Sequence, residues 1–119
     1  MLVTIVRITK GDANEEGLKI FQGTSTSGTL KYSQPVVGNN QSYTWTVCLN
    51  TGSHVLQLTD SYGDGWTSGS SVGLTFGSTV VGPYTLSSGS SGTQQFTVSA
   101  TSSIDLSNLF FYNTQRCIF

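Results

Sequence analysis

Apolar and polar residues alternate strictly over residues 42–49. Tyr43, Trp45 and two aliphatic side chains occupy one face of this segment, whereas Ser, Thr and Cys occupy the other. A period of two residues predicts a strand with one buried face. Shorter runs of β-branched and aromatic residues predict further strands. These runs cover residues 2–9, 18–22, 29–33, 54–59, 72–76, 80–86 and 94–99.

Turn-forming residues separate these segments, and apolar residues nowhere recur at helical spacing over a long stretch. The pattern predicts an all-β fold, namely an antiparallel, jelly-roll-like β-sandwich of about seven to nine strands. Residues 50–53 have the length of a hairpin loop. We therefore expect residues 42–49 and 54–59 to pair as neighbouring strands.

The carboxyl-terminal segment differs from the rest of the chain. Residues 1–98 are expected to form one sandwich module, and residues 99–103 have the composition of a flexible joint. The densely apolar residues 104–119 cannot remain in water, because exposed apolar surface costs about 25 cal/mol per Å². They either close their own sandwich as its last strand or insert into a neighbouring copy as a donated strand. The residues predicted to make this contact are Ile104, Leu106, Leu109, Phe110, Phe111, Tyr112, Ile118 and Phe119.

Charged residues make up 9% of the chain, against about a quarter in an average soluble domain. Ser and Thr together number 35, a composition that favours an extracellular or cell-surface β-protein. The five basic residues form no cluster, so the sequence argues against nucleic acid as a partner. No segment has the length of a membrane span, and none is expected.

Five of the six acidic residues lie in two short segments. Asp12, Glu15 and Glu16 form one group, and Asp60 and Asp64 belong to the other. Carboxylates and loop carbonyls supply the oxygen ligands that calcium prefers. If the two loops meet, Asp60, Asp64 and Asp12 are the predicted ligands of a Ca²⁺ ion. If they do not, the aspartates brace their own turns by accepting backbone N–H bonds.

Candidate catalytic residues are few. Residues 69–73 match the Gly-x-Ser-x-Gly pattern of serine hydrolases, but that pattern works on a strand-to-helix turn in a larger α/β fold. His54, the one histidine, is expected at a surface or edge position beside the turn at residues 50–53. Asp60 and Asp64 share one loop, whereas glycoside hydrolysis needs carboxylates on either side of a sugar. We therefore expect no enzymatic activity.

Three further features are candidates for binding or modification. Tyr62 and Trp66 are the rings that a sugar-stacking platform would use. Asn40 begins an Asn-Gln-Ser acceptor for N-linked glycosylation. Cys48 and Cys117 are the only cysteines, and they pair with each other, pair between chains or stay free.

Residues 46–66, TVCLNTGSHVLQLTDSYGDGW, are followed by GSSVGLTF at residues 69–76. Together they resemble a module repeated in large secreted and surface proteins of microbes. In that family a strand ending in Cys-Leu precedes a Gly-containing turn, a second strand and an Asp-Ser-Tyr-Gly-Asp-Gly loop. A weaker likeness extends over residues 2–98. Many members carry a second cysteine in the turn at residues 50–53, where this chain has none.

The resemblance implies a jelly-roll adhesive or structural unit, similar to subunits of extracellular fibrils. The expected function is accordingly that of a fibril or surface-appendage subunit that binds copies of itself by strand complementation. Residues 104–119 are the expected donated strand, and residues 1–9 are the alternative. Cys48 and Cys117 would lock the contact. The alternative function is a calcium-dependent carbohydrate-binding or adhesion module, with glycans as its partners.

Overall fold

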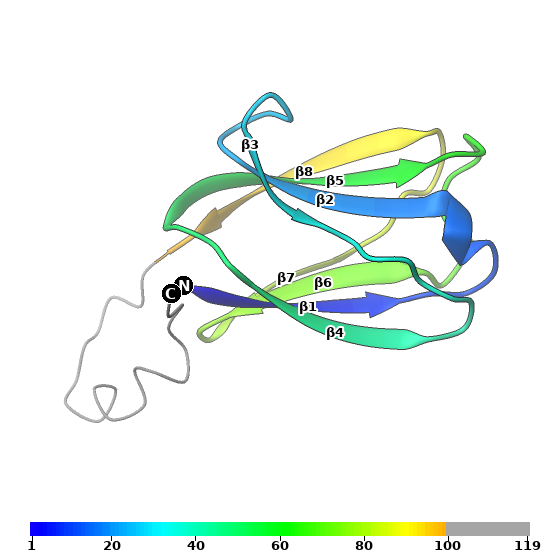
Figure 1. Ribbon diagram of the computed structural model, residues 1–119, viewed down its shortest axis with the longest axis horizontal. Coiled ribbons are helices and arrows are strands. Elements are labelled where there is room, and N and C mark those ends of the chain that lie inside the picture. The colour runs from blue at the N-terminus through cyan, green and yellow to red at the C-terminus, as the bar shows by residue number, and fades with distance from the viewer. Residues whose placement is uncertain (100–119) are drawn as a thin grey trace.

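The computed structural model describes residues 1–99, which form two antiparallel four-stranded sheets packed face to face (Figure 1). The first sheet has the order β4 (Ser42–Cys48), β1 (Leu2–Ile8), β6 (Ser71–Phe76) and β7 (Thr79–Tyr84). The second has the order β3 (Thr29–Ser33), β2 (Glu16–Gln22), β5 (Gly52–Asp60) and β8 (Ser91–Val98). The predicted all-β sandwich is confirmed, with a strand in each expected segment.

Most connections cross from one sheet to the other. Only β2 with β3 and β6 with β7 are both consecutive and paired within one sheet. The predicted hairpin across residues 50–53 is therefore wrong, because β4 pairs with β1 whereas β5 pairs with β2 and β8. A connection this short joins the edge of one sheet to the interior of the other.

The core lies between the sheets, where the inward residues of the alternating strands meet. In β6, Val72, Leu74 and Phe76 are buried, and the residues between them are half-buried. Burying each such side chain contributes about 1.5–3 kcal/mol to folding. The other buried members of this core are Val3, Ile5, Leu18, Ile20, Leu49, Leu56, Leu58, Trp66, Leu86, Phe96 and Val98.

Strand β4 forms one edge of the first sheet. Tyr43, Trp45 and Val47 are half-buried on its inward face, and the Ser and Thr residues between them are exposed. The predicted division of this strand into two faces is confirmed. Its rings are only half-buried because β4 lies at the edge of the sheet and not at its centre.

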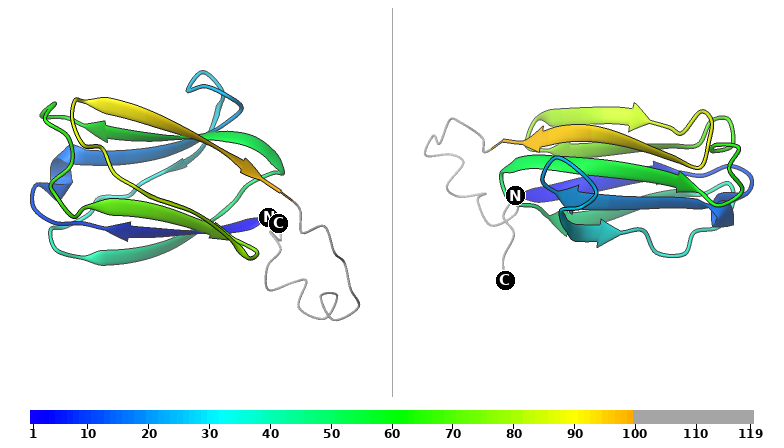
Figure 2. Two further views of the ribbon diagram at one scale, coloured as in Figure 1. Left: turned by 180° about the vertical axis from the view of Figure 1, so that it is seen from behind. Right: turned by 90° about the horizontal axis from the view of Figure 1, so that it is seen from above.

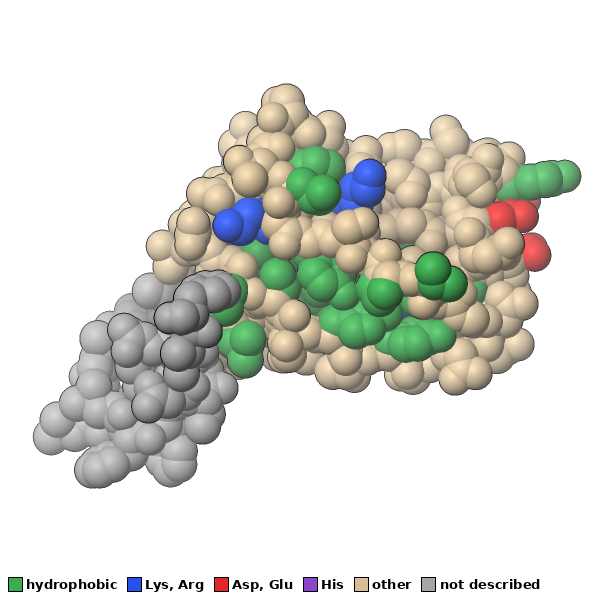
Figure 3. All heavy atoms as spheres, in the orientation of Figure 1, with side chains coloured by type: hydrophobic (Ala, Val, Ile, Leu, Met, Phe, Trp, Pro, Cys, Tyr) green, Lys and Arg blue, Asp and Glu red, His purple; other side chains and the backbone are tan. Residues whose placement is uncertain are grey.

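The two ends of the sandwich differ in chemistry. At one end, β8 leads to Ser99 and β1 begins near Met1; at the other lie the 3-10 helix Ala13–Glu15 and the loop after β5 (Figures 1 and 2). We call residues 12–16 and 60–66 at that second end the acidic pole. Figure 3 shows acidic side chains gathered there. Within residues 1–99, no helix has the length and apolar character needed to cross a membrane.

Candidate functional site

The turn after β5 is built around one buried carboxylate. Oδ2 of Asp60 accepts hydrogen bonds from the backbone N–H groups of Asp64 at 2.9 Å and Gly65 at 3.0 Å. Gly63 and Gly65 have φ angles of +85° and +87°, which side-chain-bearing residues rarely adopt. A Cβ on Gly65 would also lie 2.8 Å from the backbone carbonyl oxygen of Leu86. The predicted bracing role of Asp60 is thus confirmed for one of its two oxygens.

The two acidic segments meet at this pole. Strands β2 and β5 pair so that Glu16 lies opposite Asp60, and the N–H of Ser61 donates to the carbonyl oxygen of Glu15 at 2.9 Å. The 3-10 helix just before β2 therefore lies against the turn that follows β5. Antiparallel pairing explains this meeting, because it places the start of one strand beside the end of the other.

Three carboxylates converge where the segments meet. One oxygen each of Glu15, Asp60 and Asp64 lies within 4.8 Å of the other two. Asp60 is buried, Glu15 is half-buried and Asp64 is exposed. Asp12, which the sequence suggested as a ligand, is outside this group and Glu15 takes its place. Asp12 precedes the 3-10 helix with a left-handed backbone, whereas Glu15 is the helix residue next to the turn.

The charges at the acidic pole repel one another. Burial raises the pKa of Glu15, and the negative charges of Asp12, Asp60, Asp64 and Glu16 raise it further. The pKa of Asp64 is raised chiefly by the adjacent carboxylate side chain of Asp60, and then by burial. In the part of the chain that the structure describes, the single ion pair is Arg7–Glu16, so no basic side chain pairs with the three converging carboxylates.

A buried arginine lies beneath the pole. Nη2 of Arg7 donates to Oε1 of Glu16 at 2.6 Å, and both side chains are almost fully buried. The guanidinium carbon lies 3.9 Å from the centroid of the Trp66 ring, which places the cation over the ring face. Burial lowers the pKa of Arg7, and Glu16 opposes that change. Oε2 of Glu16 accepts the N–H of Thr67 at 2.9 Å, so the pair also holds the loop.

Arg7 was missed by the sequence reasoning, although a signal for it exists. Val3, Ile5 and Arg7 alternate on the buried side of β1, so the arginine occupies a core position. A charged residue at such a position needs a buried partner of opposite charge. Glu16, the acidic residue at the start of β2, is that partner.

The two rings of the loop lie differently. Trp66 is 6% exposed, and its Nε1–H donates to the carbonyl oxygen of Thr59 at 2.9 Å. Its predicted use as a sugar-stacking platform is wrong, because the ring fills the core beneath Arg7. Tyr62 is 76% exposed and remains available to a ligand.

His54 lies at the opposite end of β5 from Asp60. It is fully buried, its ring stacks on Phe96 with centroids 5.6 Å apart, and its Nδ1 lies 3.0 Å from the carbonyl oxygen of Gly52. Burial lowers its pKa, and the charge of Lys31 contributes to the same direction. The expected surface or edge position is therefore wrong, because His54 faces inward on β5, which lies between β2 and β8.

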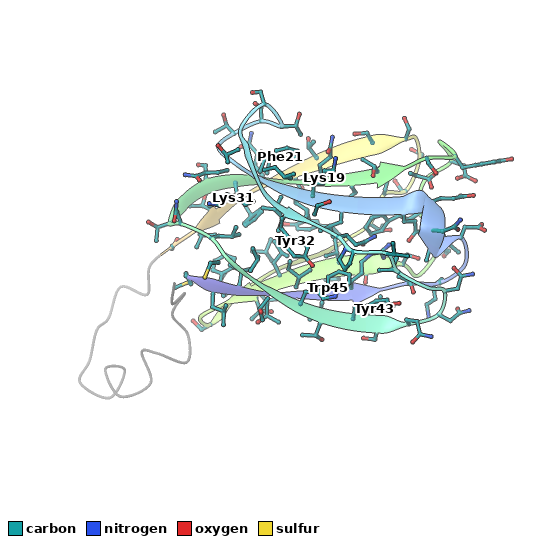
Figure 4. The ribbon with its side chains drawn as sticks, viewed as in Figure 1. Lys19, Phe21, Lys31, Tyr32, Tyr43 and Trp45 are labelled. Atoms are coloured by element: carbon teal, nitrogen blue, oxygen red, sulfur yellow. The ribbon has the colours of Figure 1, made fainter. Side chains whose placement is uncertain are left out.

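A strip of aromatic rings lies on one side of the sandwich. Tyr32 on β3 and Trp45 on β4 have ring centroids 6.2 Å apart, and Tyr43 stacks on Trp45 at 5.3 Å. All three side chains are half-buried. Figure 4 shows them between β3 and β4, the edge strands of the two sheets. We call these three residues the aromatic strip, and Figure 3 shows hydrophobic side chains at the surface along this side.

Asn40 and Cys48, the two predicted modification sites, lie within the described residues. Asn40 is exposed in the connection between β3 and β4, with a left-handed backbone and its N–H bonded to the carbonyl oxygen of Lys10. Cys48 is the last residue of β4. Its predicted partner Cys117 and the predicted contact residues 104–119 lie outside the described residues.

No protein-family model, curated protein or solved structure matches this chain.

Proposed function

We propose that this chain is a non-enzymatic subunit of an extracellular fibril or surface appendage, and that it assembles by strand complementation. Residues 104–119 of one copy would lie along the free edge of β4 in the next copy. The observation that carries the proposal is the character of that edge. It is long and uncharged, and the aromatic strip lies beside it.

Strand β4 lacks the features by which edge strands usually prevent pairing with another chain. It pairs with β1 along all seven of its residues and, among the described strands, with no other. It contains neither a charged residue nor a proline, the usual protections of an edge. By contrast, β3 carries Lys31 and β7 carries Pro83. Among the described strands, none lies along the outer edge of β4 over residues 42–47, so this edge is suited to accept an added strand.

The aromatic strip supplies the apolar surface that a donated strand needs. Tyr32, Tyr43 and Trp45 bridge the edges of both sheets and are only half-buried. Strand β8, another edge without charge or proline, instead exposes Thr93, Gln94 and Gln95. Main-chain pairing gives affinity to an added strand, and pockets for alternate side chains give it specificity. Among the four edge strands, β4 therefore offers the best combination of main-chain pairing and apolar surface.

Residues 104–119 are the proposed occupant because of their composition. Eight large apolar or aromatic side chains fall within this segment. The sandwich of residues 1–99 already encloses a core between two sheets, with Leu49 and Val98 buried at the end where β1 begins and β8 finishes. A segment donated from each copy to the next makes a head-to-tail contact, which extends into a filament. The low charge and high hydroxyl content support an extracellular location.

Truncation tests this function. A chain ending at Ser99 should fold, as measured by far-ultraviolet circular dichroism, and should stay monomeric under conditions in which the full chain forms filaments in negative-stain electron microscopy. Filaments formed by the folded, truncated chain would contradict the proposal.

The second candidate function is a calcium-dependent carbohydrate-binding or adhesion module. It is favoured by Tyr62, whose ring is 76% exposed in the loop that also carries Asp60 and Asp64. An exposed aromatic ring beside acidic groups suits stacking on a sugar. Glycan-array binding that Tyr62→Ala abolishes, with the fold intact, would support this function. Binding that persists in Tyr62→Ala would argue against it.

A further inference from the structure

The acidic pole combines a cluster of carboxylates with an unpartnered oxygen. Asp60 is 2% exposed, and its Oδ2 already accepts two backbone N–H bonds. Its Oδ1 is also buried and has no hydrogen-bond partner among the described residues. A buried polar atom without a partner is costly, and a buried charged one is more so. A ligand that contacts carboxylate oxygen would therefore satisfy Oδ1 of Asp60.

The surroundings of the Asp60 carboxylate determine which ligand fits. Glu15 and Asp64 each bring an oxygen into the same group, within 4.8 Å. Among the described residues the buried Lys or Arg side chain is Arg7, which is held by Glu16 at 2.6 Å and lies over the Trp66 ring. Three converging carboxylates without a basic partner suit a positively charged ligand. Two glycines permit the backbone conformation of the turn, and Asp60 holds it through two hydrogen bonds, so the turn is formed without a ligand.

The spacing of the oxygens agrees with one hard divalent cation. Two oxygens that each lie about 2.3–2.6 Å from a shared calcium ion are separated by no more than about 5 Å. Carboxylates are hard ligands, which favours calcium or magnesium over zinc or copper. Calcium accepts about six to eight oxygens in irregular geometry, whereas magnesium demands a near-ideal octahedron. An irregular loop with one buried, one half-buried and one exposed carboxylate suits calcium better.

We propose that Glu15, Asp60 and Asp64 together bind one calcium ion at the acidic pole. The ion would join the segment before β2 to the turn after β5. Three carboxylates supply part of its coordination shell, and water or loop carbonyl oxygens supply the rest. This site is independent of the proposed assembly by residues 104–119, because it lies at the end of the sandwich opposite the point where β8 ends (Figure 1).

Isothermal titration calorimetry of the full chain, first stripped with a chelator, tests the site. We expect calcium chloride to bind with a stoichiometry of one, and magnesium chloride at the same concentration to bind at least about tenfold more weakly. Saturating calcium should raise the melting temperature by at least about 4 °C, because an ion that binds only the folded state stabilises it. Absence of binding heat, or equal affinity for magnesium, would overturn the proposal.

Variants separate a specific site from general attraction to negative charge. Asp64→Asn and Glu15→Gln each remove one ligand charge without a core substitution, and each should weaken calcium binding at least about tenfold. Asp12→Asn is the matched control, because it removes a neighbouring charge outside the group of three. It should leave the affinity nearly unchanged. An equal loss in Asp12→Asn and Asp64→Asn would show nonspecific attraction and overturn the proposal.

Discussion

The guanidinium of Arg7 and the carboxylate of Glu16 form an ion pair that is buried almost completely, with 2.6 Å between Nη2 and Oε1. Arg7 comes from the interior of β1 in one sheet, and Glu16 begins β2 in the other. The pair therefore links the two sheets. The pair also holds the loop after β5, because Glu16 accepts the N–H of Thr67 and the guanidinium of Arg7 lies over the Trp66 ring.

Removing the positive charge of this pair should destabilise the protein strongly. Arg7→Met leaves the buried Glu16 without a partner of opposite charge, and removing one member of a buried pair costs about 3–5 kcal/mol. The free energy of unfolding from urea denaturation measures the loss. Lys10→Met, which removes an exposed charge, is the control and should change stability by less than about 0.5 kcal/mol. Equal losses in both variants would contradict a special role for the pair.

Two glycines of the turn provide a matched pair of variants. Gly63→Ala adds a Cβ in open space, so its only cost is the strain of a left-handed backbone, about 1–2 kcal/mol. Gly65→Ala has a similar backbone strain, and its added Cβ would also lie 2.8 Å from backbone atoms of Leu86 and Ser88. We expect Gly65→Ala to lose clearly more stability in urea denaturation. Equal losses would show that the close approach between the two loops is absent in solution.

The buried His54 predicts a loss of stability in mild acid. Its folded-state pKa lies below the ordinary value of about 6.5, so above that pH both states hold a neutral ring. As the pH falls below about 6.5, the unfolded state binds a proton more readily than the folded state, and stability decreases until the folded pKa is passed. Lys31 and the amino terminus, whose charges act on the ring, strengthen this effect.

His54→Phe isolates this contribution. The phenyl ring can keep the stacking on Phe96 but cannot take up a proton. The free energy of unfolding should fall less between pH 7 and pH 5 in the variant than in the native protein, when both are measured by urea denaturation. Parallel pH profiles would show that His54 does not titrate differently in the two states. The comparison between the two proteins cancels the contributions of Glu15 and Asp64.

The aromatic strip predicts which surface accepts the donated segment. Tyr32→Lys places a charge between β3 and β4, whereas Tyr84→Lys replaces a half-buried ring on β7 with the same charge. The first variant should prevent filament formation in electron microscopy, and the second should permit it. Urea denaturation of both variants controls for their stability. Filaments from Tyr32→Lys, or their loss in Tyr84→Lys at equal stability, would contradict this assignment of the acceptor surface.

Alternation along the chain was enough to predict the strands, because each strand has one buried face. Residues 42–49 and 71–76 show this most clearly. Strand pairing was not predictable in the same way. The short connection at residues 50–53 fits both a hairpin and a crossing between sheets. Which of the two forms depends on strands distant in the sequence, because β1 pairs with β4 whereas β2 and β8 pair with β5.

The sequence predicted that two acidic loops could meet, but not which three carboxylates would converge there. The choice of Glu15 over Asp12 depends on the short 3-10 helix, which no periodic pattern reveals. The burial of Trp66 and His54 depends on what each ring packs against. For Trp66 that partner is Arg7, a charged residue at an inward position of β1.

The most direct test of the proposed assembly asks which copy residues 104–119 contact. Phe110 is replaced by the photo-crosslinking analogue benzoylphenylalanine, and chains with natural nitrogen are mixed with ¹⁵N-labelled chains before assembly and irradiation. Mass spectrometry should find Phe110 crosslinked to β3 or β4 in mixed light–heavy pairs, because the segment is donated to another copy. Crosslinks confined to light–light and heavy–heavy pairs would show that each chain buries its own segment, and would contradict the account.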